Sequence, residues 1–488
     1  MLTRKTMLAA AGALAIAAPA AAQPIPVGHL MDNSGATSDV GVPYGQGVSD
    51  ALRWVNATRN GVAGRQLNVL GFDYGYQAPR AVSQYQAWSR QNVVAIQGWG
   101  TADTEALVRF VTRDRIPYIS GSYSAALTDA GGQSGRQGVE AAPYNFFYGP
   151  SYSDALRGML IWAKQDWESR GQQGRPKYVH MGANHPYPNS PKEAGETLAR
   201  ELGFDVLPAI QFALTPGDYT AQCLTLRQQG ANYAYLGNTA GSNISVLRAC
   251  QTAGVQVQFL GNVWGMDENA MKAAGTAANG VVFPVRTDAT WGEITGQVQP
   301  PAPERSAGVR GALAALRRAQ EALRPVDGSA ELVGDIERAI AALEAEPLPA
   351  PPAPPAGLAL LREISRISDQ AGNAYRPVHY LAGVCAAMLM VEAMDTAAAN
   401  GGQITGVRIR DGFYARQNWV PAGFDGVCVP STFTATDHRG TLRVGLYRAR
   451  VTGDTSQGTV GELMQAGTMR LEPVTTITLD RRADWLGW

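Results

Sequence analysis

Short apolar runs alternate with segments of helical periodicity from residue 25 to about residue 285. The apolar runs span residues 67–72, 93–96, 118–119, 178–181, 233–236, 259–260 and 281–282. The segments of helical spacing between them span residues 44–56, 78–90, 154–169, 192–202, 219–229 and 242–253. Alternating strands and helices predict an α/β fold with parallel sheets.

Residues 298–357 break this alternation. The segment opens with prolines at 300–303, closes with prolines at 347–355, and holds two helix-patterned pieces between them. We predict an inserted helical hairpin on proline-rich arms, standing off the surface as either a mobile spacer or a docking element. Beyond it, the pattern predicts a helix over 378–399, strands over 427–434 and 442–448, and a turn at 437–440.

The first 22 residues have the pattern of a secretory signal. Arg4 and Lys5 precede an apolar run over 7–18, and Ala20–22 suit cleavage after Ala22. No later stretch reaches the roughly 18 uninterrupted apolar residues that a membrane span needs. The longest candidate, 380–391, stops at Glu392 and predicts a buried helix. We expect a soluble exported protein without membrane insertion.

Composition excludes several classes of function. Lys plus Arg and Asp plus Glu each number 41, so nothing favours nucleic acid or an anionic membrane as a partner. The four cysteines, Cys223, Cys250, Cys385 and Cys428, are too few and too far apart for a zinc site or a disulfide scaffold, and their pairing stays open.

Known catalytic and cofactor motifs are missing from the sequence. It holds neither G-x-G-x-x-G after a first strand nor G-x-x-x-x-G-K-[ST], and neither G-x-S-x-G nor H-E-x-x-H. The five histidines are scattered, and His180 and His185 have poor spacing for a shared metal. We therefore expect no cofactor, no metal and no catalysis.

Two hydroxyl-rich loops point to a ligand site. Residues 98–101 (GWGT) and 120–124 (SGSYS) each follow an apolar run, and the stretch 104–115 between them has helical spacing. Successive parallel strands deliver both loops to the carboxyl edge of one sheet, where open α/β sheets bind small ligands. Hydroxyls and backbone N–H groups at a helix N-terminus suit a carboxylate. Taken singly, Thr101 and Ser122 equally suit helix capping.

Further motifs follow in order along the chain. Tyr44-Gly45 opens the first helix, and the two loops are followed by 184–187 (NHPY), 261–265 (GNVWG) and 437–440 (DHRG). With the signal peptide, this series resembles the type I periplasmic solute-binding proteins of ABC importers, in the leucine/isoleucine/valine-binding group. The resemblance covers nearly all of the mature chain except 298–357.

The resemblance implies two Rossmann-like lobes joined by three hinge crossings, with the ligand held in the cleft. By position, the crossings fall near 146–147, 284–285 and 439–446. Lobe one is then 23–147 plus 285–439, which includes the insertion at 298–357, and lobe two is 148–284 plus 440–488.

The resemblance also assigns the ligand contacts. It places an α-carboxylate on Thr101 and Ser124 and builds the pocket wall from aromatic side chains, although core packing is an equal alternative for Trp99. The implied ligand-binding residues are Tyr44, Trp99, Thr101, Ser122, Tyr123, Ser124, Tyr187, Val263 and Trp264. Family members that bind amino acids pair the ammonium with a glutamate in the turn where this chain has Asn262-Val263-Trp264. Asp267 and Asp103 are the candidate substitutes.

The implied function is that of a monomeric periplasmic protein that delivers a small carboxylate-bearing solute to ABC permease subunits. Family membership favours a branched-chain or related amino acid. The alternative is a soluble sensory co-receptor for an aromatic or amide solute. Because a buried ammonium without a carboxylate partner is costly, the turn at Trp264 leaves open whether the amine is recognised.

Overall fold

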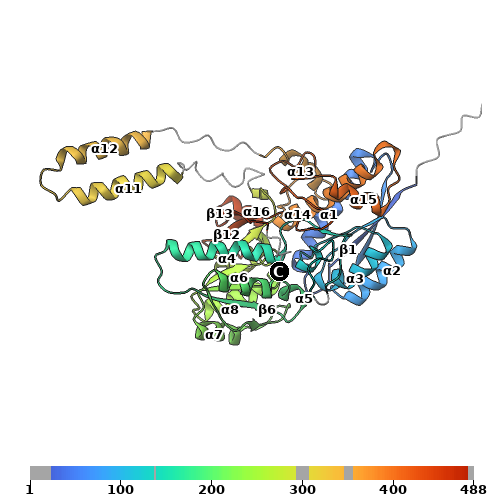
Figure 1. The fold of residues 1–488 in the computed structure, drawn as a ribbon, viewed down its shortest axis with the longest axis horizontal. Helices are drawn as coiled ribbons and strands as arrows, with labels where there is room; N and C mark the ends of the chain where they lie inside the picture. Colours follow the sequence, from blue (N-terminus) through green and yellow to red (C-terminus); the bar gives the residue numbers. More distant parts are fainter. Residues whose placement is uncertain (1–22, 137–138, 293–306, 346–354, 482–488) are drawn as a thin grey trace, which may run out of the picture.

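The computed structural model describes residues 23–136, 139–292, 307–345 and 355–481. The predicted signal peptide and the proline-rich arms of the insertion fall largely outside these residues. Two mainly parallel sheets organise the chain, as Figure 1 shows.

The first sheet has five parallel strands in the order β2-β1-β3-β4-β5. They are β1 (Ile25–Met31), β2 (Leu67–Asp73), β3 (Ala95–Gln97), β4 (Tyr118–Ser120) and β5 (Asn145–Phe147). The helices of this part are α1 (Ser38–Arg59), α2 (Ala78–Arg90), α3 (Thr101–Asp114), α13 (Leu358–Ser365), α14 (Val378–Ala398) and α15 (Gly406–Tyr414).

The second sheet has eight strands in the order β13-β12-β11-β10-β9-β6-β7, with β8 paired to β6. They are β6 (Lys177–Gly182), β7 (Asp205–Val206), β8 (Ile210–Gln211), β9 (Tyr233–Leu236), β10 (Gln258–Gly261), β11 (Val282–Val285), β12 (Arg443–Val451) and β13 (Met469–Thr478). Only β12 runs antiparallel to its neighbours β11 and β13. The helices are α4 (Tyr152–Ser169), α5 (Pro186–Asn189), α6 (Lys192–Glu201), α7 (Thr220–Gln229), α8 (Ala240–Thr252), α9 (Glu268–Ala274) and α16 (Val460–Gln465).

The chain passes between the two sheets three times. It leaves the first sheet after β5 and enters α4, which packs on β11, β12 and β13. It leaves the second sheet after β11, and α13 and α14 then pack on α1 beside the first sheet. It returns to the second sheet at β12, which begins at Arg443.

These sheets and helices confirm the predicted α/β class, but the strand expected over 427–434 is wrong. That segment makes only isolated bridges, such as Cys428 with Thr287 and Ser431 with Trp419. Pro430 lies in its middle and has no N–H to donate to a ladder, so a regular strand cannot continue through it.

Helix α14 is the core helix that the sequence predicts. Among the described residues it is the one helix long and apolar enough to cross a membrane, and 83% of its most apolar window is buried inside the fold. Its partner is α1, and the two backbones meet at glycines. A Cβ on Gly383 would overlap the carbonyl oxygen of Tyr44, and one on Gly47 would overlap that of Tyr380. This close crossing fixes the position of Tyr44.

The predicted pair of helices in the insertion is present as α11 (Ala307–Leu323) and α12 (Ala330–Ala345). They pack on each other, with Arg317 pairing with Glu344 at 2.5 Å and Gln320 donating to Glu337 at 2.8 Å. Figure 1 shows them projecting away from both sheets. The two helices therefore pack mainly on each other.

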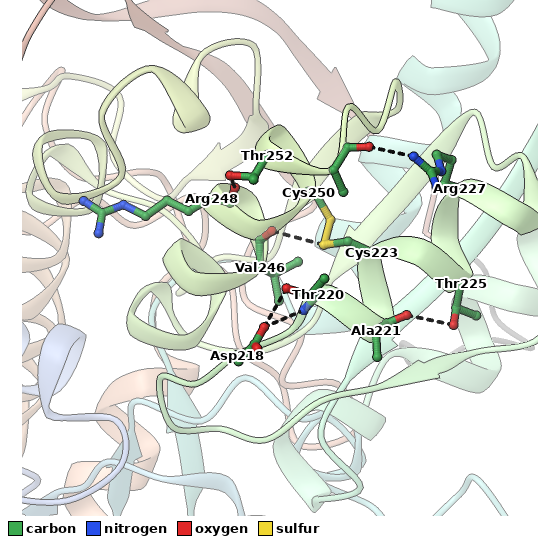
Figure 2. Close-up of a disulfide and its surroundings, with 11 residues drawn as sticks. Asp218, Thr220, Ala221, Cys223, Thr225, Arg227, Val246, Arg248, Cys250 and Thr252 are labelled. Atoms are coloured by element: carbon green, nitrogen blue, oxygen red, sulfur yellow. Dashed lines mark hydrogen bonds between the residues drawn. A yellow bond between two sulfur atoms is a disulfide. The ribbon is translucent and has the colours of Figure 1, made fainter.

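Two disulfides resolve the pairing that the sequence leaves open. Cys223 bonds to Cys250, and Cys385 bonds to Cys428. The first, drawn in Figure 2, ties α7 to α8. The second ties α14 to the irregular segment around residue 428.

Candidate functional site

A small cavity lies where loops of the two sheets meet. Its volume is about 10 Å³, and its lining residues are Thr37, Tyr76, Trp99, Gly100, Thr101, Tyr152, Tyr187, Thr239 and Trp264. Five of these belong to segments around the first sheet and four to segments around the second. The cavity is therefore an inter-sheet feature with room for about one water molecule.

Four of the nine residues expected to bind ligand line this cavity: Trp99, Thr101, Tyr187 and Trp264. The other five are buried close behind them. Tyr44 packs against Trp99 and Trp264 with ring centroids 5.3 Å apart in each case. Tyr123 lies 5.5 Å from Trp264 between ring centroids. Val263 is buried beside Trp264 in the same turn.

The N-terminus of α3 points its first residue into the cavity. Thr101 begins the helix, and the preceding Gly100 has no side chain to cap it. The Thr101 hydroxyl accepts a hydrogen bond from the Ser122 hydroxyl at 2.8 Å, which joins the two hydroxyl-rich loops. Because a helix N-terminus carries partial positive charge, this end of the cavity favours an anionic group.

Ser124 makes its hydrogen bonds away from the cavity lining. Its hydroxyl donates to Glu105 at 2.7 Å and accepts from the backbone N–H of Ala126, capping the short 3-10 helix Ala125–Leu127. Ser190 also donates to it at 3.2 Å. Ser124 does not line the cavity. Ser124 therefore caps a short 3-10 helix, whereas the Thr101–Ser122 pair lies at the cavity.

The Trp264 indole packs between segments of the two sheets. Its ring centroid lies 4.7 Å from that of Trp99, and its Nε1 donates to the Gly121 carbonyl at 3.1 Å. Asn262 holds the turn, since its Oδ1 accepts from the Trp264 backbone N–H and from the Tyr187 hydroxyl, each at 2.7 Å. Trp264 thus links a second-sheet turn to a first-sheet loop.

Arg286 lies behind this indole and was not anticipated from the sequence. It follows β11 directly and is 2% exposed. Its guanidinium lies 3.7 Å from the Trp264 ring centroid and donates to the Tyr123 hydroxyl at 3.3 Å and to His379 Nδ1 at 2.6 Å. Burial and the nearby Arg286 charge lower the pKa of His379 well below its usual range, so this histidine is a neutral acceptor.

The two acids considered as ammonium partners lie outside the cavity lining. Asp267 caps α9 by accepting from the Ala270 backbone N–H at 2.7 Å, and burial raises its pKa to about 8. Asp103 accepts from the Tyr74 hydroxyl at 2.9 Å. Burial raises the pKa of Asp103 to about 7 against the opposing effect of that hydrogen bond.

Four further lining residues were not predicted from the sequence. Tyr152 begins α4, Thr37 precedes α1, Thr239 precedes α8, and Tyr76 lies in the loop after β2. The Thr239 hydroxyl is buried at the cavity, close to the Asp39 carboxylate of α1. Their position along the chain could have identified two of them, because Thr239 and Tyr76 each follow the carboxyl end of a strand.

Metal ligands are not gathered at the cavity or elsewhere in the described ranges. Residues 23–136, 139–292, 307–345 and 355–481 hold no group of three or more His, Cys, Asp or Glu side chains placed to bind an ion. The lining is instead hydroxyl and aromatic, which suits binding of a small organic solute.

Comparison with solved structures matches the whole fold. A substrate-binding protein of an ABC transporter from Aeropyrum pernix is 20% identical, with a TM-score of 0.66 over 95% of this chain and 98% of its own. A branched-chain amino acid ABC transporter protein from Thermus thermophilus with bound valine is 20% identical, with a TM-score of 0.67 over 94% of this chain and 97% of its own. A fatty acid ABC transporter substrate-binding protein from Thermomonospora curvata is 16% identical, with a TM-score of 0.66 over 95% and 94%.

The sequence itself matches one family. No curated protein matches the chain. The periplasmic binding protein family matches over residues 24–298, more than half of the chain, and confirms the resemblance drawn from the motifs. The chain belongs to the periplasmic binding protein family.

Proposed function

We propose that this chain is the extracytoplasmic solute-binding component of an ABC importer for a small carboxylate-bearing solute with an apolar body. The observation that carries the proposal is the cavity built by both sheets, with the α3 N-terminus and Thr101 at one side and aromatic rings around it. Donors at a helix N-terminus suit a carboxylate, and the rings suit an apolar body.

The structural relatives support the same solute class. One is described with bound valine and another is named for fatty acids. Valine and fatty acids share a carboxylate and an apolar body and differ in the amine. A branched-chain or related amino acid therefore remains within the proposed class, as the resemblance expects.

Uptake of such a solute requires the two sheets to move apart. Small-molecule pockets usually measure about 300–1,000 Å³, whereas this cavity measures about 10 Å³. The three chain crossings would act as hinges between a first lobe (23–147 plus 285–439) and a second lobe (148–284 plus 440–488). Opening would break contacts such as Trp264 Nε1 to the Gly121 carbonyl, and the lobes would then close around the bound solute.

Scattering and calorimetry test the proposal together. A panel of amino acids, aliphatic acids and aromatic acids is screened by thermal shift, and hits are titrated by calorimetry. We expect a solute that binds to reduce the radius of gyration, because it closes the lobes. Absence of binding across the panel, or a radius unchanged at saturation, contradicts the solute trap.

The importer assignment has its own test. The loaded protein should bind the purified permease subunits encoded beside its gene and stimulate ATP hydrolysis by the transporter. A monomer in the periplasm is the expected form. Solute binding without any effect on a permease favours the sensory co-receptor instead.

A further inference from the structure

We infer that this cleft selects solutes that carry a carboxylate and no ammonium group, and that Arg286 enforces this selection through the Trp264 indole. The inference rests on the proposed function, which leaves the amine undecided. It assigns a specificity-determining role to a residue that touches the cavity wall rather than the cavity itself.

A cation, the Arg286 guanidinium, already lies on the Trp264 indole. The Arg286 guanidinium lies 3.7 Å from the ring centroid of Trp264, and Trp264 lines the cavity. A solute ammonium held by the same ring would lie within about 10 Å of the guanidinium carbon, since cation–π contacts reach about 6 Å from a centroid. In a site this buried, the two positive charges repel with little screening by solvent.

The Arg286 guanidinium has no carboxylate partner among the described residues. Its hydrogen bonds go to the Tyr123 hydroxyl and to His379 Nδ1, which are both uncharged groups. Over the part of the chain that the structure describes, no acidic side chain lies within ion-pair distance of this guanidinium. A buried cation without a counter-ion is costly, and an anionic solute reduces that cost.

The groups that face the cavity directly are hydroxyls and a helix N-terminus. Thr101 presents a hydroxyl at the α3 N-terminus, and the buried Thr239 contributes a second hydroxyl to the lining. Hydroxyls donate to a carboxylate, and the helix end attracts negative charge. The lining holds no acidic side chain: Asp103 and Asp267 lie outside it, and the carboxylate of Asp39, which lies close to Thr239, accepts a hydrogen bond from the Gly241 backbone N–H at 2.5 Å.

The test compares matched pairs of solutes in the intact mature protein. Leucine, valine and phenylalanine are each titrated against the des-amino analogue, with the corresponding carboxyl-free amine as a third arm. We expect every acid that binds to bind at least tenfold more tightly than its amino acid, and the amines not to bind. Equal or tighter binding of the amino acids overturns the inference and leaves the proposed function standing.

Variants of Arg286 test its role. Arg286→Met removes the charge and keeps an apolar side chain against the indole, and we expect the preference for the des-amino acid to fall at least tenfold. Arg286→Lys keeps the charge and should keep the preference. A preference unchanged in Arg286→Met overturns the role of Arg286. If Arg286→Met does not fold, Arg286→Lys and the three solute arms in the wild type still decide. If no solute of any arm binds, both this inference and the proposed carboxylate class fall.

Discussion

Replacing Trp264 with alanine should destabilise the protein by about 3–5 kcal/mol, the usual cost of removing a buried tryptophan. The indole is 2% exposed and is held on its sides by Trp99, Tyr44 and Tyr123. A buried aromatic of this kind removes about 150–250 Å² from water, worth about 4–6 kcal/mol at 25 cal/mol per Å². The variant also loses the bond from Nε1 to the Gly121 carbonyl. We therefore expect both lower stability and weaker solute binding.

The loss is measurable by thermal unfolding. At about 2.1 cal/mol/K per residue, a chain of this size has an unfolding entropy near 1 kcal/mol/K, so the midpoint should fall by about 3–5 °C if both lobes unfold together. The cavity left by the indole is lined by rings, and apolar cavities of that size bind aromatic molecules. Added indole should therefore raise the midpoint of Trp264→Ala and leave that of the wild type unchanged.

A tryptophan elsewhere provides the control. Trp162 lies on α4 in a separate core cluster and is 7% exposed. Trp162→Ala should lose comparable stability without changing solute affinity. A Trp264→Ala midpoint within about 1 °C of the wild type, together with no response to indole, would refute the conclusion that this side chain packs between segments of the two sheets.

Three other predictions follow from the geometry. Thr101→Val should weaken binding of a carboxylate solute tenfold to a hundredfold by calorimetry, because a hydrogen bond to a charged group contributes about 1.5–3 kcal/mol. Ser124→Ala should change the affinity less than about threefold, because that hydroxyl caps a helix. Equal effects of the two substitutions would contradict this difference. Deleting 298–357 and joining the ends with a short linker should leave affinity within a few-fold, because α11 and α12 pack on each other; a variant that fails to fold would contradict it. Burial raises the pKa of Asp267 from 3.8 to about 8, so the folded protein keeps a proton that the unfolded chain releases. Stability from this group is complete below pH 3.8 and is lost as pH rises to about 8, so the unfolding midpoint should fall between about pH 4 and 8. The fall should be smaller in Asp267→Asn, and parallel curves for the two proteins would contradict the prediction.

The positions of site residues near the first sheet could be predicted from the sequence, because they follow from the order of neighbouring strands and helices. A strand, a loop, a helix and a second strand must place both loops at one sheet edge, which puts Thr101 beside Ser122. Tyr187 was accessible for a related reason, since Pro186 and Pro188 flank it in a rigid short helix. In both cases a few neighbouring residues determine the geometry.

Other positions depend on packing between distant segments and were not accessible. The Ser124 hydroxyl donates to Glu105, one helical turn beyond Thr101, and the sequence analysis did not predict that contact. Tyr152 and Thr239 reach the cavity only because α4 and α8 of the second sheet approach the first sheet. No periodicity within either helix encodes that approach.

The charge of Arg286 and the presence of Trp264 in the 261–265 turn act on the same part of the cleft. The resemblance implies a glutamate, in amino-acid binders, in the turn where this chain has Asn262-Val263-Trp264. The sequence did not show that the Trp264 side chain faces a buried guanidinium, because His379, which holds that guanidinium, lies 93 residues further along the chain and beyond the insertion. A carboxylate close to Arg286 would compensate its charge, whereas the indole leaves the positive charge in place. The indole and the arginine therefore change the charge of the cleft in the same direction, toward solutes without an amine.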